Sequence, residues 1–298
     1  MTSQREDVRI SAGIEFSRRA RLLRRIYKVL IACWRFLYPI VLVFGCLYLI
    51  LPSIVVILAS VSKTSYVTFP PQGVSFKWYG NFFTREGLVQ SFVLSAGLAL
   101  AVAFLAVAVS VILSVLVGRR ARGVQSWAVT LAYLPLLLPT IVYGPALLLW
   151  MSHFNILDAF WSTMFTLGAA HLILALPFAL QSIMVGYDRL DPTYEEAALV
   201  MGARPPKVFH YITLPLMMST IIAGATFSFL ISFDEPVVAL FFTRVDFITL
   251  PVRIFQYLRY KPDPTIAAIA TIITLISMIL VVVADRMVGL GRLMGLRR

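Results

Sequence analysis

Residues 91–117 read SFVLSAGLALAVAFLAVAVSVILSVLV, a run without a single Asp, Glu, Lys or Arg. A helix crosses the hydrocarbon core of a bilayer with about 20 mostly apolar residues, so this run is long enough to span a membrane. Only helices and closed barrels satisfy their own backbone hydrogen bonds inside lipid. The run does not alternate with the two-residue period of a barrel strand, and it therefore predicts a transmembrane helix.

Five further runs share this character, and together they predict an all-α membrane protein with six transmembrane helices. Of the 298 residues, 60% are hydrophobic and 13% are charged, whereas soluble domains have about 45–50% and 25%. This composition excludes a disordered chain, a coiled coil and a small disulfide scaffold. The other five predicted spans are Tyr38–Val61, Trp127–Trp150, Phe160–Met184, Leu214–Phe233 and Ile266–Ala284.

The positive charges predict the orientation of these spans. The chain carries 26 Lys and Arg against 14 Asp and Glu. With the N-terminus in the cytoplasm, 19 of the 26 basic residues lie on the cytoplasmic side, as the positive-inside rule requires. Both termini are then cytoplasmic. The basic residues lie between apolar runs and in the tails, so anionic lipid is the expected partner and nucleic acid is not.

The segment before the first span has a helical pattern of its own. Between Phe16 and Leu37, apolar residues recur at steps of three and four, with Arg and Lys between them. This pattern predicts a basic amphipathic helix lying on the inner leaflet. The alternative is a basic tail that only sets the orientation. We therefore divide the chain into a cytoplasmic basic segment, residues 1–37, and a transmembrane domain, residues 38–298.

Helix-breaking prolines concentrate in the third and fourth predicted spans. Pro135, Pro139 and Pro145 lie in the third, and Pro177 lies in the fourth. Each proline removes a backbone donor and tends to kink a helix, and the freed carbonyls must face protein or a wet cavity. These two spans are therefore candidates for lining a path through the membrane. The alternative is a pair of bent packing helices.

The cytoplasmic loop at residues 185–213 carries strong helix punctuation. Asp191 is a natural N-cap and Pro192 suits a first helical position. Gly202 suits a left-handed closing position, and the prolines after it prevent continuation. A short helix, Pro192–Met201, is therefore expected to stand between the fourth and fifth spans. A second short helix is expected from Lys207 into Leu214.

The same loop resembles the signature of ABC importer permeases. Glu196-Ala197-Ala198, then Gly202, then Ile212-Thr213-Leu214-Pro215 match that family's "EAA" pattern at every signature position. The resemblance implies the MetI-like type I importer permease fold, in which this loop is the coupling helix that docks on an ATPase subunit. The coupling residues it implies here are Tyr194, Glu195, Glu196, Ala197, Ala198, Gly202 and Ala203.

Two further segments resemble the PotC-type spermidine/putrescine permeases. They are Ser232-Phe233-Asp234-Glu235-Pro236 and Thr249-Leu250-Pro251-Val252. The resemblance implies import of a polyamine or a related cationic amine from the periplasm by alternating access. Permeases for opines or amino-acid derivatives share these features, so such a solute is the alternative. An ATP-independent secondary transporter is a further alternative, although the charge-free spans argue against it.

The resemblance also implies an assembly in the bacterial inner membrane. The chain has no Gly-x-x-x-x-Gly-Lys-Ser/Thr phosphate loop, so we expect a partner to bind ATP and Mg. The resemblance implies that this partner is an ATPase subunit present in two copies. The chain itself is expected to be no enzyme and to hold no cofactor or metal. The other partners implied are a second, different permease of the PotB type and a periplasmic solute-binding protein.

An acidic pair ends the fifth predicted span and suggests where a cationic substrate passes. Asp234 and Glu235 lie near the outer face if that helix begins at Leu214. Acidic groups beside a cavity attract cations, and Phe233 and Tyr143 are further candidates for the translocation path. The alternatives are that the acids cap a helix end, pair with a nearby arginine, or contact the binding protein.

His171 is the single titratable imidazole in the predicted spans. An intramembrane histidine commonly makes a hydrogen bond between helices. A proton relay would need acidic neighbours at the same depth, and the spans contain none. We therefore expect a packing role for His171.

Overall fold

The computed structural model describes residues 3–118, 122–153, 160–244, 247–260 and 263–288. It divides into two units, Met1–Ile57 and Leu58–Arg298. The first unit is one long helix, α1 (Ser3–Ser60), whose last turn enters the second unit. Its apolar part, Trp34–Ser60, contains most of the first predicted span. The basic N-terminal segment is part of the same continuous helix.

Four long helices of the second unit account for the second, fourth, fifth and sixth predicted spans. α3, α6 and α9 pack against one another, and α12 packs against α9. Their bounds are α3 (Leu88–Val117), α6 (Phe160–Asp188), α9 (Leu214–Phe233) and α12 (Thr265–Val288). Together with α1, the described residues contain five helices long and apolar enough to cross a membrane.

Small residues let these helices approach closely. Ala99, Ala103 and Ala106 are buried along α3. A Cβ placed on Gly186 of α6 would lie 2.1 Å from Thr220 Oγ1 of α9, so only glycine fits there. Lipid is as apolar as leucine and supplies no hydrophobic drive between helices, so close packing of small residues is what holds such a bundle.

The third predicted span is broken, which corrects the prediction of a single helix over Trp127–Trp150. It consists of α4 (Arg122–Tyr133), η1 (Leu134–Leu137) and α5 (Thr140–His153), and its two halves meet at 98°. Leu138 is extended at ψ 134° because the ring of Pro139 disfavours the helical region for the residue before it. Counted with this bent pair, the described spans number up to six. Pro177, by contrast, lies inside an unbroken α6.

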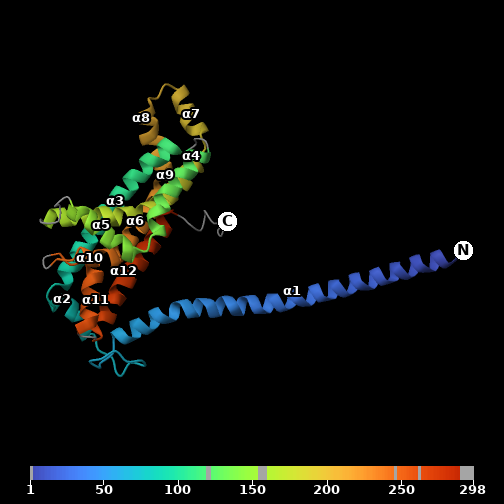
Figure 1. Ribbon diagram of the computed structural model, residues 1–298, viewed down its shortest axis with the longest axis horizontal. Helices are drawn as coiled ribbons and strands as arrows, with labels where there is room; N and C mark the ends of the chain where they lie inside the picture. The colour runs from blue at the N-terminus through green and yellow to red at the C-terminus, as the bar shows by residue number, and fades with distance from the viewer. Residues whose placement is uncertain (1–2, 119–121, 154–159, 245–246, 261–262, 289–298) are drawn as a thin grey trace. The chain divides into compact units, whose positions relative to one another are not determined.

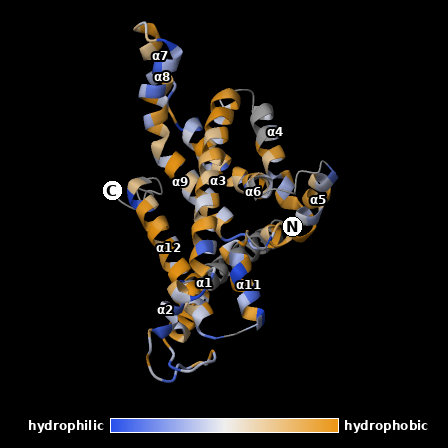
Figure 2. Cartoon of the chain, turned by 90° about the vertical axis from the view of Figure 1, so that its left-hand side faces the viewer, coloured by the Kyte–Doolittle hydropathy of each residue, from blue (hydrophilic) through white to orange (hydrophobic). Residues whose placement is uncertain are grey.

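The short helices lie at opposite ends of the second unit. α7 and α8 project at one end, whereas α2 and α11 lie at the other (Figure 1). Figure 2 shows hydrophilic residues on α7 and α8, beside the mostly hydrophobic bundle helices. The remaining elements are α2 (Lys77–Thr84), α7 (Thr193–Val200), α8 (Pro205–Val208), the π-helical turn η2 (Phe209–Thr213), α10 (Val237–Phe241) and α11 (Leu250–Tyr260).

Candidate functional site

The projecting helix α7 begins and ends as its sequence predicts, within one residue at each end. The backbone N–H of Thr193 donates to Asp191 Oδ1 at 3.0 Å. Gly202 has φ +87°, and its N–H donates to the Leu199 carbonyl at 2.9 Å. The N–H of Ala203 donates to the Ala198 carbonyl at 3.0 Å. This pair of bonds around a left-handed glycine is a Schellman motif, which satisfies the carbonyls at the helix end.

α7 has an inner face and an outer face. On the inner face Ala198 is buried, and the half-buried Glu195 accepts a hydrogen bond from Thr213 Oγ1 at 2.5 Å. Glu196 is exposed. Four apolar side chains of α7 and of its C-terminal end are exposed: Tyr194, Leu199, Val200 and Met201, the last two by 88% and 82%. Such a cluster on a polar projection indicates contact with another protein.

The chain after α7 differs from the predicted separate second helix. α8 continues through η2 into α9, so that Pro205–Phe233 is one helix with a π-helical turn. The N–H of Leu214 donates to the Phe209 carbonyl, five residues back. Pro215 has no N–H to bond the Tyr211 carbonyl and its ring crowds that carbonyl, which explains a widened turn immediately before it.

Asp234 and Glu235, the acidic pair after α9, have different surroundings. Glu235 Oε1 accepts hydrogen bonds from the N–H groups of Val237 and Val238 at 2.8 and 3.0 Å. Glu235 therefore caps α10, one of the alternatives considered above. Asp234 is exposed and remains the candidate for contact with a cation.

The two aromatic path candidates do not join the acids in one site. Phe233 is buried in a cluster with Phe82, Leu88 and Leu250, where its ring stacks on Phe229. Tyr143 belongs to another buried cluster, formed around α5, α6 and α10. The Tyr143 hydroxyl is buried without a hydrogen-bond partner among the described residues.

His171 makes the interhelical hydrogen bond that its position predicts. It is 1% exposed, and its Nδ1 lies 3.0 Å from Ser232 Oγ, which links α6 to α9. This contact satisfies one ring nitrogen and supports the predicted packing role, whereas the buried Nε2 has no hydrogen-bond partner among the described residues.

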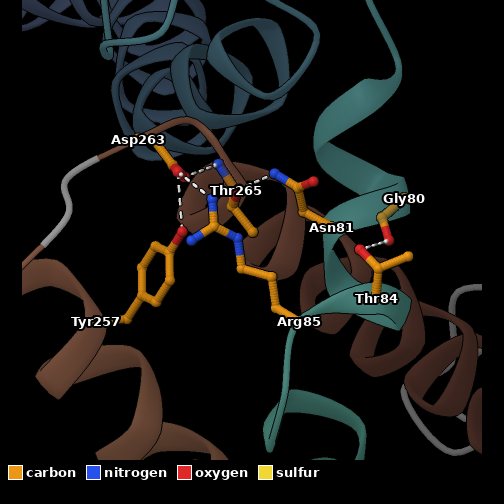
Figure 3. A network of polar contacts seen from close by, with 7 residues as sticks. All are labelled: Gly80, Asn81, Thr84, Arg85, Tyr257, Asp263 and Thr265. Carbon is orange, nitrogen blue, oxygen red and sulfur yellow. Dashed lines mark hydrogen bonds and ion pairs between the residues drawn. The ribbon is translucent and has the colours of Figure 1, made fainter.

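A polar network at the opposite end of the bundle has no counterpart in the sequence analysis. Arg85 Nη2 lies 3.1 Å from Asp263 Oδ2, and the Tyr257 hydroxyl donates to the same oxygen at 2.9 Å. Asn81 Nδ2 donates to Thr265 Oγ1 at 3.0 Å. Figure 3 shows these side chains converging from α2, α11 and the start of α12. Burial, together with the Asp263 carboxylate, raises the pKa of Tyr257 and keeps its hydroxyl a donor.

One part of this network does carry a sequence signal. Asp263-Pro264-Thr265 repeats the Asp-Pro-Thr order that begins α7. The N–H of Thr265 donates to Asp263 Oδ1 at 2.9 Å, as Thr193 does to Asp191. The same three residues therefore start a helix at each end of the bundle.

Next to this network lies an open pocket of about 470 Å³. It combines two guanidinium groups with aromatic side chains, a lining suited to contact with a polar protein surface. Its lining residues are Arg85, Glu86, Leu88, Arg253, Gln256, Tyr257 and Tyr260.

Replacement of Asp263 tests how much this network stabilises the end of the bundle opposite α7. We expect Asp263→Ala to lower the free energy of unfolding by about 1–2 kcal/mol, because α12 loses its cap and Arg85 its partner. Asp263→Asn keeps an acceptor oxygen and is expected to lose less. Thermal unfolding of the purified protein in detergent measures both, and equal losses would show that the charge matters more than the cap.

Comparison with known proteins finds one family and several relatives. Residues 110–290 match the binding-protein-dependent transport system inner membrane component family. The spermidine/putrescine transport system permease protein PotC of Haemophilus influenzae is 31% identical over 239 residues, which are 80% of this chain and 91% of that protein. The putrescine transport system permease protein PotI of Escherichia coli K12 is 31% identical over 248 residues, which are 80% and 85%.

Solved structures share the fold at low identity. A chain of a bacterial ABC transporter involved in the import of the acidic polysaccharide alginate aligns with a TM-score of 0.54 at 16% identity, covering 86% of this chain and 95% of that one. A chain of an amino acid ABC transporter aligns with a TM-score of 0.50 at 16% identity, covering 73% and 99%. Both support the MetI-like importer permease fold.

Proposed function

The chain belongs to the family of binding-protein-dependent transport system inner membrane components, and we propose that it is one of two permease subunits of an ATP-driven importer. It is a transport permease subunit with several membrane spans, and its place is the inner membrane of a bacterium. ATP and Mg are bound by a separate ATPase, present in two copies, and this chain needs no cofactor. The second permease is a different, PotB-like chain.

One observation carries the proposal: α7 projects at one end of the bundle (Figure 1), and the side chains exposed at its tip are apolar. Val200 and Met201 are more than four-fifths exposed there. Exposure of apolar surface to water costs about 25 cal/mol per Å². Burial of these side chains against a partner protein would remove that cost. The residues proposed to contact or position the ATPase are Tyr194, Glu195, Glu196, Ala197, Ala198, Gly202 and Ala203.

The proposed mechanism is alternating access. ATP binding draws the two ATPase copies together, and their movement displaces α7 of each permease. α7 is connected through η2 to α9, and α9 packs against α3, α6 and α12. Movement of α7 therefore reaches the helices that surround the path, which opens to the periplasm when the ATPases close.

The proposed substrate is a polyamine or a related cationic amine. Two relatives named for putrescine or spermidine/putrescine transport align over 80% of this chain. The exposed Asp234 supplies a negative charge for a passing amine. Tyr143 is proposed to lie along the path, with a buried hydroxyl that has no hydrogen-bond partner among the described residues, and Phe233 and Glu235 position the end of α9. The fold alone does not select the solute, since a relative at 33% identity over 193 residues, in Mycobacterium bovis, is named a molybdenum transport permease, ModB.

The orientation proposed places α7 in the cytoplasm and α2 and α11 outside. Both termini are then cytoplasmic, with residues 1–37 on the inner leaflet, residues 38–298 as the transmembrane domain and residues 185–213 as the coupling loop. The outer pocket beside Arg85 and Arg253 would face the periplasmic solute-binding protein.

Reconstitution of the complex tests the proposal. The two permeases and the ATPase are placed in liposomes with the binding protein, and ATP hydrolysis is measured with putrescine, spermidine, octopine or amino acids. We expect stimulation by an amine and import that stops without ATP. Stimulation by an opine alone would reject the substrate class, and import that survives removal of ATP would reject the importer itself.

Removing the acidic charges tests the proposed path. We expect Asp234→Asn with Glu235→Gln to raise the KM for amine import several-fold, because a cation loses its attraction to the outer end of α9. The glutamine keeps an acceptor for the Val237 and Val238 N–H groups, so assembly is expected to be preserved. Glu235→Gln alone is the control, and an unchanged KM in the double variant would remove the acids from the path.

A further inference from the structure

The two adjacent glutamates of α7 have different surroundings, and this difference has a functional meaning. Successive residues on a helix point about 100° apart, so the two side chains cannot share a face. Glu196 is exposed, as a residue that meets a partner must be. Glu195 turns inward and accepts a hydrogen bond from Thr213 Oγ1 at 2.5 Å. Thr213 is 2% exposed.

Thr213 lies at the junction between η2 and α9. It is the last residue of η2, directly before α9 begins at Leu214. Its bond with Glu195 spans 18 residues of sequence and connects α7 to the base of a bundle helix. A hydrogen bond to an ionised carboxylate is about twice as strong as one between neutral groups.

The covalent connection between α7 and α9 transmits movement less directly than this hydrogen bond does. It passes through Gly202, which has φ +87° and no atom within 4 Å of an added Cβ, and through the extended Arg204. The extended Arg204 interrupts the helical hydrogen bonds between α7 and α8, so this link is less rigid than a continuous helix. A rigid transfer of movement needs a second attachment, and the bond from Thr213 supplies one.

We propose that Glu195 and Thr213 form an internal latch through which movement of α7 is transmitted to α9. In this role Glu195 is a positioning residue that acts inside the chain, and the contact with the ATPase is made by its neighbours on the outer face. The proposal deepens the proposed function and rests on it, because a latch has meaning only if an ATPase moves α7.

The test follows α9 directly and needs no knowledge of the solute. Cys33 and Cys46, the two cysteines of the chain, are replaced by serine, and Asp234→Cys places a thiol just beyond the outer end of α9. The labelling rate of this thiol by a membrane-impermeant reagent is measured in the assembled complex, with and without ATP and orthovanadate. We expect trapping to change the rate, and Thr213→Val to reduce that change at least about threefold.

Matched variants separate the latch from a general structural effect. Thr213→Ser keeps the hydroxyl and is expected to restore the response. Thr226→Val makes the same change in α9 at a hydroxyl that, within the part of the chain that the structure describes, donates to the Ile222 carbonyl of its own helix, and it should respond like the parent. Glu195→Ala and Glu195→Gln form a second pair, of which Gln keeps the acceptor. Co-purification of the ATPase shows which variants assemble.

The outcomes test the latch separately from the proposed importer function on which it rests. A full response in Thr213→Val or Glu195→Ala overturns the latch and leaves the importer standing. A parent complex whose labelling does not change on trapping overturns both. Joint replacement of both residues should be no worse than either single change, and additive losses would show that the two side chains act separately.

Discussion

Val200→Asp at the tip of α7 is expected to reduce ATP-dependent import at least about tenfold, because a buried, unpaired carboxylate at the centre of an interface costs several kcal/mol. Val200 is 88% exposed in this chain, so the folded permease itself loses no packing. The loss should therefore appear in association, and the ATPase should no longer co-purify with the permease. Met201→Asp is expected to act in the same way.

The control for this change lies at the opposite end of the bundle. Val74 is 71% exposed and precedes α2, so Val74→Asp adds the same charge far from α7. ATPase co-purification should persist in that variant. Normal co-purification and import in Val200→Asp would mean that the tip of α7 meets no partner, and the proposed function would lose its main support.

Gly186→Ala is expected to destabilise the bundle, because its Cβ would lie 2.1 Å from Thr220 Oγ1 and 2.7 Å from Thr220 Cβ. Atoms cannot approach so closely, so α6 and α9 must separate. Overpacking of this kind costs about 1–3 kcal/mol. We expect less protein in the membrane and an apparent Tm several degrees lower in detergent.

Two further variants identify the cause of that loss. Gly97→Ala places a Cβ where no atom lies within 4 Å, and alanine favours helix by about 1 kcal/mol, so its Tm should not fall. Thr220→Gly removes the whole obstructing side chain and should recover part of the Tm in combination with Gly186→Ala. A Gly186→Ala protein as stable as the parent would contradict the close approach of the two helices.

Much of the fold could be predicted from local patterns. The charge-free runs locate the spans because each residue placed in lipid contributes its own transfer free energy, whatever its neighbours. The ends of α7 are equally local. Asp191 bonds an N–H two residues away, and Gly202 adopts a conformation that its missing Cβ permits.

The third span shows where such patterns stop being sufficient. Pro135 and Pro139 predict a disturbance, yet Pro177 lies in an unbroken helix. A proline removes one backbone hydrogen bond in either place. Whether the helix bends there or stays continuous depends on how the adjacent helices pack around it. The 98° break therefore depends on the packed bundle as well as on the extended conformation that Pro139 favours at Leu138.

The candidate sites divide in the same way. The coupling loop could be found in sequence, because its residues are close together and follow a recognisable order. The separate roles of Glu195 and Glu196 could not, since nothing local decides which carboxylate turns toward Thr213. The polar network opposite α7 joins Arg85 to Asp263, 178 residues apart, and no pattern of neighbouring residues indicates such a pair.

Composition and local spacing thus determined that this chain spans a membrane, where α3, α6, α9, α12 and the short α7 lie, and which loop projects. Only the tertiary structure decided which of two glutamates faces inward, that Glu235 caps α10, and that three separate segments meet at the end of the bundle opposite α7. The physical reason is that lipid transfer and backbone conformation are properties of single residues and their neighbours. Hydrogen bonds between distant side chains exist only after helix packing has brought them within reach.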